Sequence, residues 1–319
     1  MQQVTLDEIA AAASIVYSEM QATPQYCWPL LCERLGTEVW VKHENHTPNG
    51  AFKIRGGLVY FAHLANSSAI PTGVVCATRG NHGQSVGFAA RRYGIPTTIV
   101  VPHGNSREKN AAMQALGVKL LEHGDDFQAA REFAIKLARE EELQMVPSFD
   151  PLLVTGVATY SLELLSAVKD LDVAYVPIGL GSGICGMFAA RDALNLKIEI
   201  VGVVSSHASA YAESFSSGRP VESPVSTKIA DGIACRIPEL SALELIWKGV
   251  ERIVQVSDTE IAESMRIMYE CTHNVCEGAG AAAIAAALQE SSKNKGLKVA
   301  VIASGGNVDR DVFAKILNG

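Results

Sequence analysis

The chain has 319 residues, of which 48% are hydrophobic and 19% charged, so it can bury a large core and is long enough for two lobes. Its formal net charge is -7 and its basic residues are scattered, which argues against nucleic acid or an anionic membrane as a partner. The apolar runs have the length of strands and are too short to span a bilayer. Because both nucleic acid and membranes are disfavoured as partners, we expect the partner to be a small molecule.

The first predicted element is a helix that begins at a capping box, Thr5-Leu6-Asp7-Glu8. After it, short runs rich in branched residues alternate with helix-length segments. The predicted strands are 39–41, 74–77, 97–101, 119–121, 174–178, 198–204 and 299–303, and the predicted helices include 54–65, 84–93, 107–116, 127–141, 156–168 and 262–271. This alternation is typical of an α/β protein with parallel sheets.

We therefore predict two doubly wound parallel-sheet domains. The large domain comprises residues 1–70 and 150–319, and a small, mobile domain comprises residues 71–149. The segment 205–236 lacks clear periodicity and is rich in Ser, Gly and Pro, which inside a compact domain indicates a functional or mobile loop.

The N-terminus shows no basic segment followed by an apolar one, so we predict no signal peptide and a cytoplasmic location. The seven cysteines form no Cys-x-x-Cys pattern, and most have apolar neighbours. We assign none of them to a disulfide or a metal site.

Two segments at opposite ends of the chain predict one cofactor site. Lys53 ends the segment Pro48-Asn49-Gly50-Ala51-Phe52-Lys53, and its amine can hold an aldehyde as a Schiff base. Ser304 follows the strand 299–303, where ligands of parallel sheets bind, and its hydroxyl can bond a pyridine nitrogen. Either feature alone is more often a surface lysine or a turn, but together they indicate pyridoxal phosphate.

The loop Gly179-Leu180-Gly181-Ser182-Gly183 follows a strand and precedes an apolar helix, so its amides can converge on a phosphate. One alternative is a tight turn that binds nothing. Another is a dinucleotide fingerprint at residues 181–186 with Glu199 on the ribose. We expect Glu199 inside its strand, and a dinucleotide would leave Lys53 and Ser304 without roles, so a monophosphate is favoured.

A second polar loop, Thr78-Arg79-Gly80-Asn81-His82, lies at another strand-to-helix junction and predicts a site for an amino-acid carboxylate. An alternative is that Asn81 merely caps the following helix. We interpret His82 as a packed histidine rather than a base. Glu44 is expected to fix a loop, and Glu277 to favour the positive end of an Ala-rich helix, although it could approach the cofactor.

With these motifs in this order, the chain resembles the fold type II pyridoxal phosphate enzymes, within them the serine and threonine dehydratase and serine racemase group. The resemblance rests on segments 44–53, 80–84, 176–183 and 304–309 and covers nearly the whole chain. It implies that Lys53 is the Schiff base and the Cα base, that Phe52 packs on the ring, that Asn81 binds the phenolic oxygen and Ser304 the pyridine nitrogen. It also assigns the phosphate to Gly179, Leu180, Gly181, Ser182 and Gly183, and the substrate to Thr78, Arg79, Gly80 and His82.

The resemblance implies an ammonia-lyase (dehydratase) that converts a β-hydroxy-α-amino acid, by default L-threonine or L-serine, to a 2-oxo acid and ammonia by α,β-elimination. A serine on the pyridine nitrogen, unlike a carboxylate, does not enforce full protonation of the ring, which favours elimination over transamination. A homodimer is usual in this family.

The chain departs from the family pattern at two places. The group commonly carries Ser-Ser-Gly-Asn-His, and here Thr78 and Arg79 replace the serines. The second serine is the opposite-face acid of the racemases, and a guanidinium stays protonated, so we predict elimination without efficient racemisation. The racemases also use an acidic divalent-metal site, but residues 203–208 contain no carboxylate, so no metal is expected there.

The unknown orientation of Arg79 leaves the identity of the substrate open. If it points inward, it can pair with the substrate α-carboxylate or with a side-chain carboxylate, as in 3-hydroxyaspartate; otherwise it is a solvated surface residue. A 3-hydroxyaspartate or phenylserine dehydratase and, less favoured, an amino-acid racemase are therefore the alternatives to a threonine or serine dehydratase.

Overall fold

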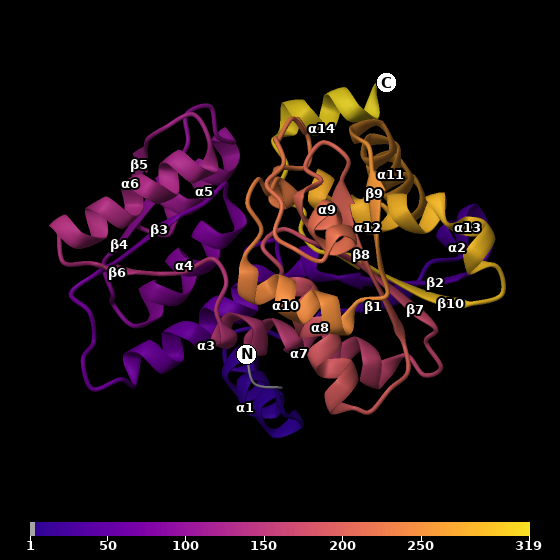
Figure 1. Cartoon of the computed structure of the whole chain (residues 1–319), viewed down its shortest axis with the longest axis horizontal. Helices are drawn as coiled ribbons and strands as arrows, with labels where there is room; N and C mark the ends of the chain where they lie inside the picture. The colour runs from indigo at the N-terminus through magenta and orange to yellow at the C-terminus, as the bar shows by residue number, and fades with distance from the viewer. Residues whose placement is uncertain (1–3) are drawn as a thin grey trace.

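The structure, a computed structural model, describes residues 4–319. Residues 1–3, which begin the segment from which we predicted no signal peptide, lie outside the described residues. Figure 1 shows two lobes, each built from a twisted sheet with helices on both faces. Among the described residues no helix is both long and apolar enough to cross a membrane.

The large lobe contains a six-stranded sheet in the order β1-β2-β10-β7-β8-β9. Its strands are β1 (Gln25–Cys27), β2 (Glu38–His43), β7 (Val173–Pro177), β8 (Glu199–Ser205), β9 (Arg252–Val256) and β10 (Lys298–Ala303). Neighbouring strands are parallel except for β1, which pairs antiparallel with β2. Because β10 inserts between β2 and β7, the last strand of the chain lies beside one of the first.

Helices cover both faces of the large sheet, as the apolar strands require. One face packs on α7 (Pro151–Ala167), α8 (Ser182–Ala193) and α10 (Leu240–Gly249), and the other on α2 (Pro29–Leu35), α11 (Asp258–Thr272) and α12 (Gly278–Gln289). Successive residues of β10 alternate between the two cores: Ala300 and Ile302 enter the first, and Val299 and Val301 the second. The sheet is therefore doubly wound.

The small lobe contains a four-stranded parallel sheet in the order β5-β4-β3-β6. Its elements are β3 (Val74–Ala77), α4 (Asn81–Arg92), β4 (Thr97–Val101), α5 (Arg107–Ala115), β5 (Lys119–Glu122), α6 (Phe127–Glu140) and β6 (Gln144–Met145). Val74 and Cys76 face a core shared with α3 (Lys53–Ala65) and α4, while Val75 and Ala77 face α6. The fold class is thus confirmed, and the domain boundaries at 70/71 and 149/150 stay a prediction.

The remaining elements pack around these two sheets or connect them. They are α1 (Leu6–Tyr17), η1 (Glu44–His46), α3 (Lys53–Ala65), α9 (Ala210–Ser217), η2 (Asp231–Ile233), α13 (Ser291–Asn294) and α14 (Arg310–Leu317). The predicted capping box of α1 is confirmed, since Thr5 and Glu8 bond each other's backbone amides. The interpretation of segment 205–236 as a loop is wrong in part, because it contains α9, which buries Tyr211, and η2.

Three strands, β1, β6 and β9, were not predicted. β1 has three residues and β6 has two, which is too few for the apolar pattern of a strand to be recognised. β9 lies at the edge of its sheet, where Arg252 and Gln255 can point to solvent and interrupt the apolar run.

Candidate active site

A cavity of about 720 Å³ lies between the two lobes, beyond the carboxyl ends of β3, β7 and β10. All of the predicted site residues line it: Phe52, Lys53, Thr78, Arg79, Gly80, Asn81, His82, Gly179, Leu180, Gly181, Ser182, Gly183 and Ser304. Carboxyl ends of parallel strands share one edge of a sheet, which is why segments so distant in sequence converge here. The structure brings the residues together, and their individual roles stay predictions.

Backbone hydrogen bonds join the lysine segment to the serine loop. The Phe52 amide donates to the Ser304 carbonyl at 3.1 Å, and the Gly306 amide donates to the Gly50 carbonyl at 2.9 Å. These bonds form because β10 ends next to β2, whose chain continues into the lysine segment. They hold Lys53, the first residue of α3, at the wall of the cavity.

The Lys53 amine points toward the glycine loop. Its Nζ lies 3.3 Å from Ser182 Oγ and 5.1 Å from the centroid of the Phe52 ring. Burial lowers the pKa of Lys53 to about 8, so roughly a fifth of the amine is neutral near physiological pH, far more than at the ordinary pKa of about 10.4. A neutral amine can attack an aldehyde and can accept a proton, whereas an ammonium can do neither.

The glycine loop opens α8 as predicted. Gly181 adopts φ +104° and a Cβ there would lie 2.7 Å from Ala242 Cβ, so the turn requires glycine on both counts. The first backbone hydrogen bond of α8 runs from the Cys185 amide to the Gly181 carbonyl. The amides of Ser182 and Gly183, which lie in the first turn, therefore have no acceptor within the helix. Such amides line the cavity and can bind an anion.

The dinucleotide alternative fails on the position of Glu199. We expected it inside its strand, but it is the exposed first residue of β8, where it pairs with Arg252 at 2.8 Å. Because β7 and β8 are parallel, Glu199 lies at the opposite edge of the sheet from the glycine loop. It cannot reach a ligand bound there.

The loop before α4 is shaped by Thr78 and Gly80. Thr78 Oγ1 accepts hydrogen bonds from the amides of Gly80 (2.9 Å) and Gly83 (3.2 Å). Gly80 has φ +148°, and a Cβ there would lie 2.3 Å from Lys109 Cδ. Gly80 is the N-cap residue and supplies no side chain, so the alternative that Asn81 caps the helix is wrong.

Asn81 instead uses its side chain across the cavity. Its Nδ2 donates to Glu277 Oε1 at 2.6 Å, and its Oδ1 accepts from Asn307 Nδ2 at 2.9 Å. Lys109 of α5 lies 2.9 Å from Glu277 and 2.7 Å from Asp231, so one small-lobe ammonium meets two large-lobe carboxylates. Sequence reasoning missed Lys109 and Asp231, because neither belongs to a motif.

Two nitrogens on the cavity wall have no hydrogen-bond partner among the described residues. They are Nε2 of His82, a residue only 8% exposed, and Nε of the half-buried Arg79. Burial and the nearby Lys53 lower the pKa of His82 to about 3, so its ring is neutral. The alternative that Arg79 points outward into solvent is wrong, since it lines the cavity.

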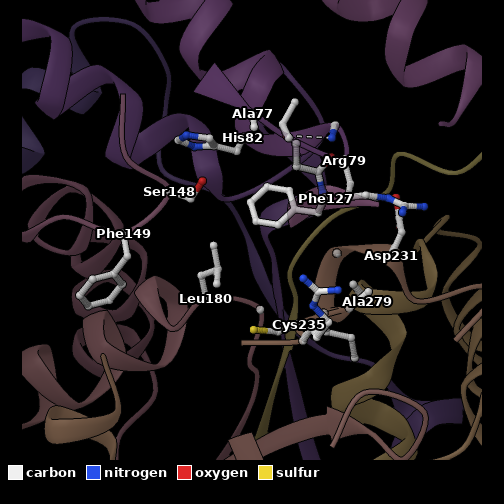
Figure 2. Close-up of a pocket in the computed structure, with 18 of the residues that line it drawn as sticks. Ala77, Arg79, His82, Phe127, Ser148, Phe149, Leu180, Asp231, Cys235 and Ala279 are labelled. Carbon is white, nitrogen blue, oxygen red and sulfur yellow. Dashed lines mark hydrogen bonds between the residues drawn. The ribbon is translucent and has the colours of Figure 1, made fainter. Parts of the chain in front are cut away.

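Figure 2 shows the rest of the wall. His82 and Ser148 lie on the side of the small lobe, with Phe127 between the lobes, and Leu180 and Cys235 face them from the large lobe. Residues of segment 224–239 also line the cavity, so the last part of the unpatterned segment 205–236 belongs to the wall. Phe127, Ser148 and Phe149 were not predicted, because aromatic and small polar residues carry no motif.

Glu44 fixes the loop below the site, as expected. It is fully buried and pairs with the equally buried Arg55 at 2.7 Å. Arg55 also bonds Glu163 at 2.6 Å, and Lys42 bonds Glu163 at 2.5 Å. This four-membered network anchors the first turns of α3 to β2 and α7.

Within residues 4–319, no group of three His, Cys, Asp or Glu side chains is arranged to hold a metal ion. All seven cysteines are free thiols, and the Sγ atoms of Cys27 and Cys32 lie 3.4 Å apart.

Comparisons with known proteins agree with this geometry. A family model described as "Pyridoxal-phosphate dependent enzyme" matches residues 17–305. The L-threonine ammonia-lyase of Thermotoga maritima is 34% identical over 316 residues, which cover 99% of this chain and 78% of that protein.

Two solved structures are similar over nearly their whole length. The processed form of threonine deaminase isoform 2 from Solanum lycopersicum has a TM-score of 0.88 and 27% identity, with 99% of this chain and 94% of that chain covered. A pyridoxal 5'-phosphate-dependent aspartate racemase has a TM-score of 0.91 and 26% identity, with 98% of each chain covered.

Proposed function

Because this chain belongs to the family of pyridoxal-phosphate dependent enzymes, we propose that it is an ammonia-lyase acting on a β-hydroxy-α-amino acid, by default L-threonine or L-serine. The products would be a 2-oxo acid and ammonia. The observation that carries the proposal is the 3.3 Å contact between Lys53 Nζ and Ser182 Oγ at the glycine loop, beside Ser304. The similarity to a protein named L-threonine ammonia-lyase supports it.

The residues of the cavity fit pyridoxal phosphate. The amides at the start of α8 would hold the phosphate, and the Lys53 amine would hold the aldehyde carbon. Ser304 is 6% exposed and its hydroxyl makes only a long bond, 3.5 Å, to the Ala279 carbonyl, so it is free to bond the pyridine nitrogen. Asn81 would contact the phenolic oxygen, and Phe52, packed edge-on against Tyr160, would cover one face of the ring.

When bound, pyridoxal phosphate withdraws electrons from the substrate Cα and thereby weakens the Cα–H bond. Lys53, with its pKa lowered to about 8, would take the Cα proton once the substrate amine has replaced it. The free amides at the start of α4 would orient the α-carboxylate. Because Ser304 is a neutral partner of the ring nitrogen and does not enforce its protonation, elimination would be faster than transamination.

The second enzymatic candidate is an amino-acid racemase, which the similarity to an aspartate racemase favours. A racemase needs an acid on the face of Cα opposite Lys53. Arg79 occupies the position that the family commonly gives to that serine, and a guanidinium does not release its proton near neutral pH. We therefore keep elimination as the primary reaction.

The test is an assay of the purified, cofactor-loaded protein against both enantiomers of serine and threonine, the 3-hydroxyaspartate stereoisomers and phenylserine. Release of 2-oxo acid and ammonia is the expected result, with leftover substrate of unchanged configuration in chiral chromatography. Interconversion of enantiomers without oxo acid would assign the protein to the racemases instead.

We also propose that the protein is a homodimer, which is usual for the family, and light scattering on the eluting protein would measure its mass. A cytoplasmic location stays a prediction from the sequence.

A further inference from the structure

Arg79 is a half-buried cation in the cavity without a carboxylate partner. Its Nε is fully buried and makes no hydrogen bond, and no Asp or Glu of the described residues lies within 4 Å of its guanidinium nitrogens. Taking a guanidinium out of water without a compensating partner costs free energy. The position therefore favours an anionic ligand that supplies the missing partner.

The other cations of the wall are already accounted for. Lys109 pairs with Asp231 and Glu277, and Arg236 pairs with Asp126 at 3.0 Å. Arg131 lines the cavity but is exposed, so water satisfies it. Lys53 faces the glycine loop. Among the residues that the structure describes, Arg79 is the half-buried guanidinium of the cavity that remains unmatched.

A monocarboxylic substrate does not need this guanidinium. The α-carboxylate of an amino acid can bind the free amides at the start of α4, next to the buried, neutral His82 with its unpaired Nε2. Arg79 precedes that turn and brings a second anion site into the same cavity. A planar guanidinium matches a carboxylate through two parallel hydrogen bonds.

We propose that Arg79 binds a second carboxylate, carried on the substrate side chain, and that the preferred substrate is a β-hydroxy-α-amino dicarboxylic acid, of which 3-hydroxyaspartate is the smallest. Loss of water from Cα and Cβ, followed by addition of water and loss of ammonia, converts 3-hydroxyaspartate to a four-carbon 2-oxo dicarboxylic acid and ammonium. This inference rests on the proposed lyase function for its chemistry. The binding of a second carboxylate by Arg79 does not depend on that function.

The experiment compares two variants with the parent holoenzyme. Arg79→Gln removes the charge and keeps hydrogen-bonding capacity. Arg91→Gln makes the same change on the exposed side of α4, away from the cavity, and serves as the control. Thermal unfolding of each variant, with and without cofactor, establishes that it is folded; Arg79→Lys, which keeps the charge, replaces Arg79→Gln if that variant fails to fold.

Two readouts are measured on each protein. Calorimetry records the binding of L-aspartate and of L-2-aminobutyrate, which lack a β-hydroxyl leaving group and differ in the second carboxylate. Steady-state kinetics record kcat/KM for 3-hydroxyaspartate and for threonine. In Arg79→Gln we expect a loss of roughly 10- to 100-fold in aspartate affinity and in kcat/KM for 3-hydroxyaspartate, with aminobutyrate and threonine little changed.

An equal loss for both ligands would mean that Arg79 binds the α-carboxylate, and no loss for either would mean that it binds neither; both results overturn the proposal. So would faster turnover of phenylserine than of 3-hydroxyaspartate by the parent enzyme. If no amino acid is deaminated, the lyase function fails, yet a selective loss of aspartate affinity would still support the second carboxylate site.

Discussion

Asn81 of the small lobe donates a 2.6 Å hydrogen bond from its side-chain amide to the carboxylate of Glu277 in the large lobe. The bond crosses the candidate active site, and Lys109 reaches the same carboxylate at 2.9 Å. Since Asn81 is also the residue predicted to contact the phenolic oxygen of the cofactor, Glu277 and Lys109 would set the orientation of that contact. The relative position of the lobes and the geometry of the site are thereby coupled.

This coupling predicts a stability cost for Lys109→Met. Burial alone would lower the pKa of Lys109, but Glu277 and Asp231 raise it overall, so the amine is charged. Removing it leaves a buried carboxylate without its counter-ion, and we expect a loss of about 3 kcal/mol in the free energy of unfolding, measured by urea denaturation. Adding Glu277→Gln to Lys109→Met should restore part of the loss. The matched control is Lys136→Met, whose exposed pair with Glu140 should contribute less than about 0.5 kcal/mol.

The network around Arg55 predicts a second, larger effect. Arg55→Met would leave Glu44 and Glu163 in the core without their guanidinium, which should cost about 3–5 kcal/mol. Arg34 makes a comparable pair with Glu263, but on the surface, so Arg34→Met should cost about 1 kcal/mol or less. Equal denaturation midpoints for the two variants would contradict the view that burial decides the energy.

Lys53→Ala should abolish both turnover and the visible absorbance band that borohydride removes, because the amine that holds the aldehyde is gone. Lys197→Ala, a change of an exposed lysine on the large lobe, is the control and should keep both. Retention of the band in Lys53→Ala would assign the cofactor to another lysine.

The lowered pKa of Lys53 predicts how the cofactor-free protein takes up pyridoxal phosphate. Below pH about 8 the amine is mostly an ammonium, which cannot attack the aldehyde, so the rate of uptake should rise as the pH passes through about 8 and level off above it. Between about pH 8 and 10.4 the unfolded chain holds a proton on this lysine that the folded chain has lost, so Lys53 makes stability rise with pH in that window. Stopped-flow absorbance of uptake from about pH 6.5 to 9.5 checks the first statement; a midpoint at about 10.4 would mean that Lys53 is not desolvated.

Gly181→Ala should weaken cofactor binding. Gly218→Ala is the control, because both glycines have positive φ but only Gly181 is crowded. An added methyl at Gly181 would press against Ala242, whereas at Gly218, with φ +66°, no heavy atom lies within 4 Å of the added methyl. Both substitutions cost about 1 kcal/mol of backbone strain. Only Gly181→Ala should lower the affinity for pyridoxal phosphate in a fluorescence titration, since only it displaces the loop that faces the phosphate. Equal affinities would remove this loop from the phosphate site.

Much of the backbone could be predicted from the sequence. Strands such as 74–77 and 97–101 and helices such as 127–141 were placed to within a residue, because branched apolar runs and helical periodicity are local properties. Edge strands were missed where the pattern was too short. The α/β class and the parallel sheets followed from the alternation itself.

The sequence by itself determined which motifs exist: the lysine segment, the polar loop before α4, the glycine loop and Ser304. Only the tertiary structure decided that Arg79 turns into the cavity, that Asn81 bonds Glu277 rather than capping its helix, and that Lys109 lies between two carboxylates. A motif is a local pattern that fixes backbone conformation. The partner of a side chain is set by which distant segments the packed sheets bring within a few ångströms, and no single segment contains that information.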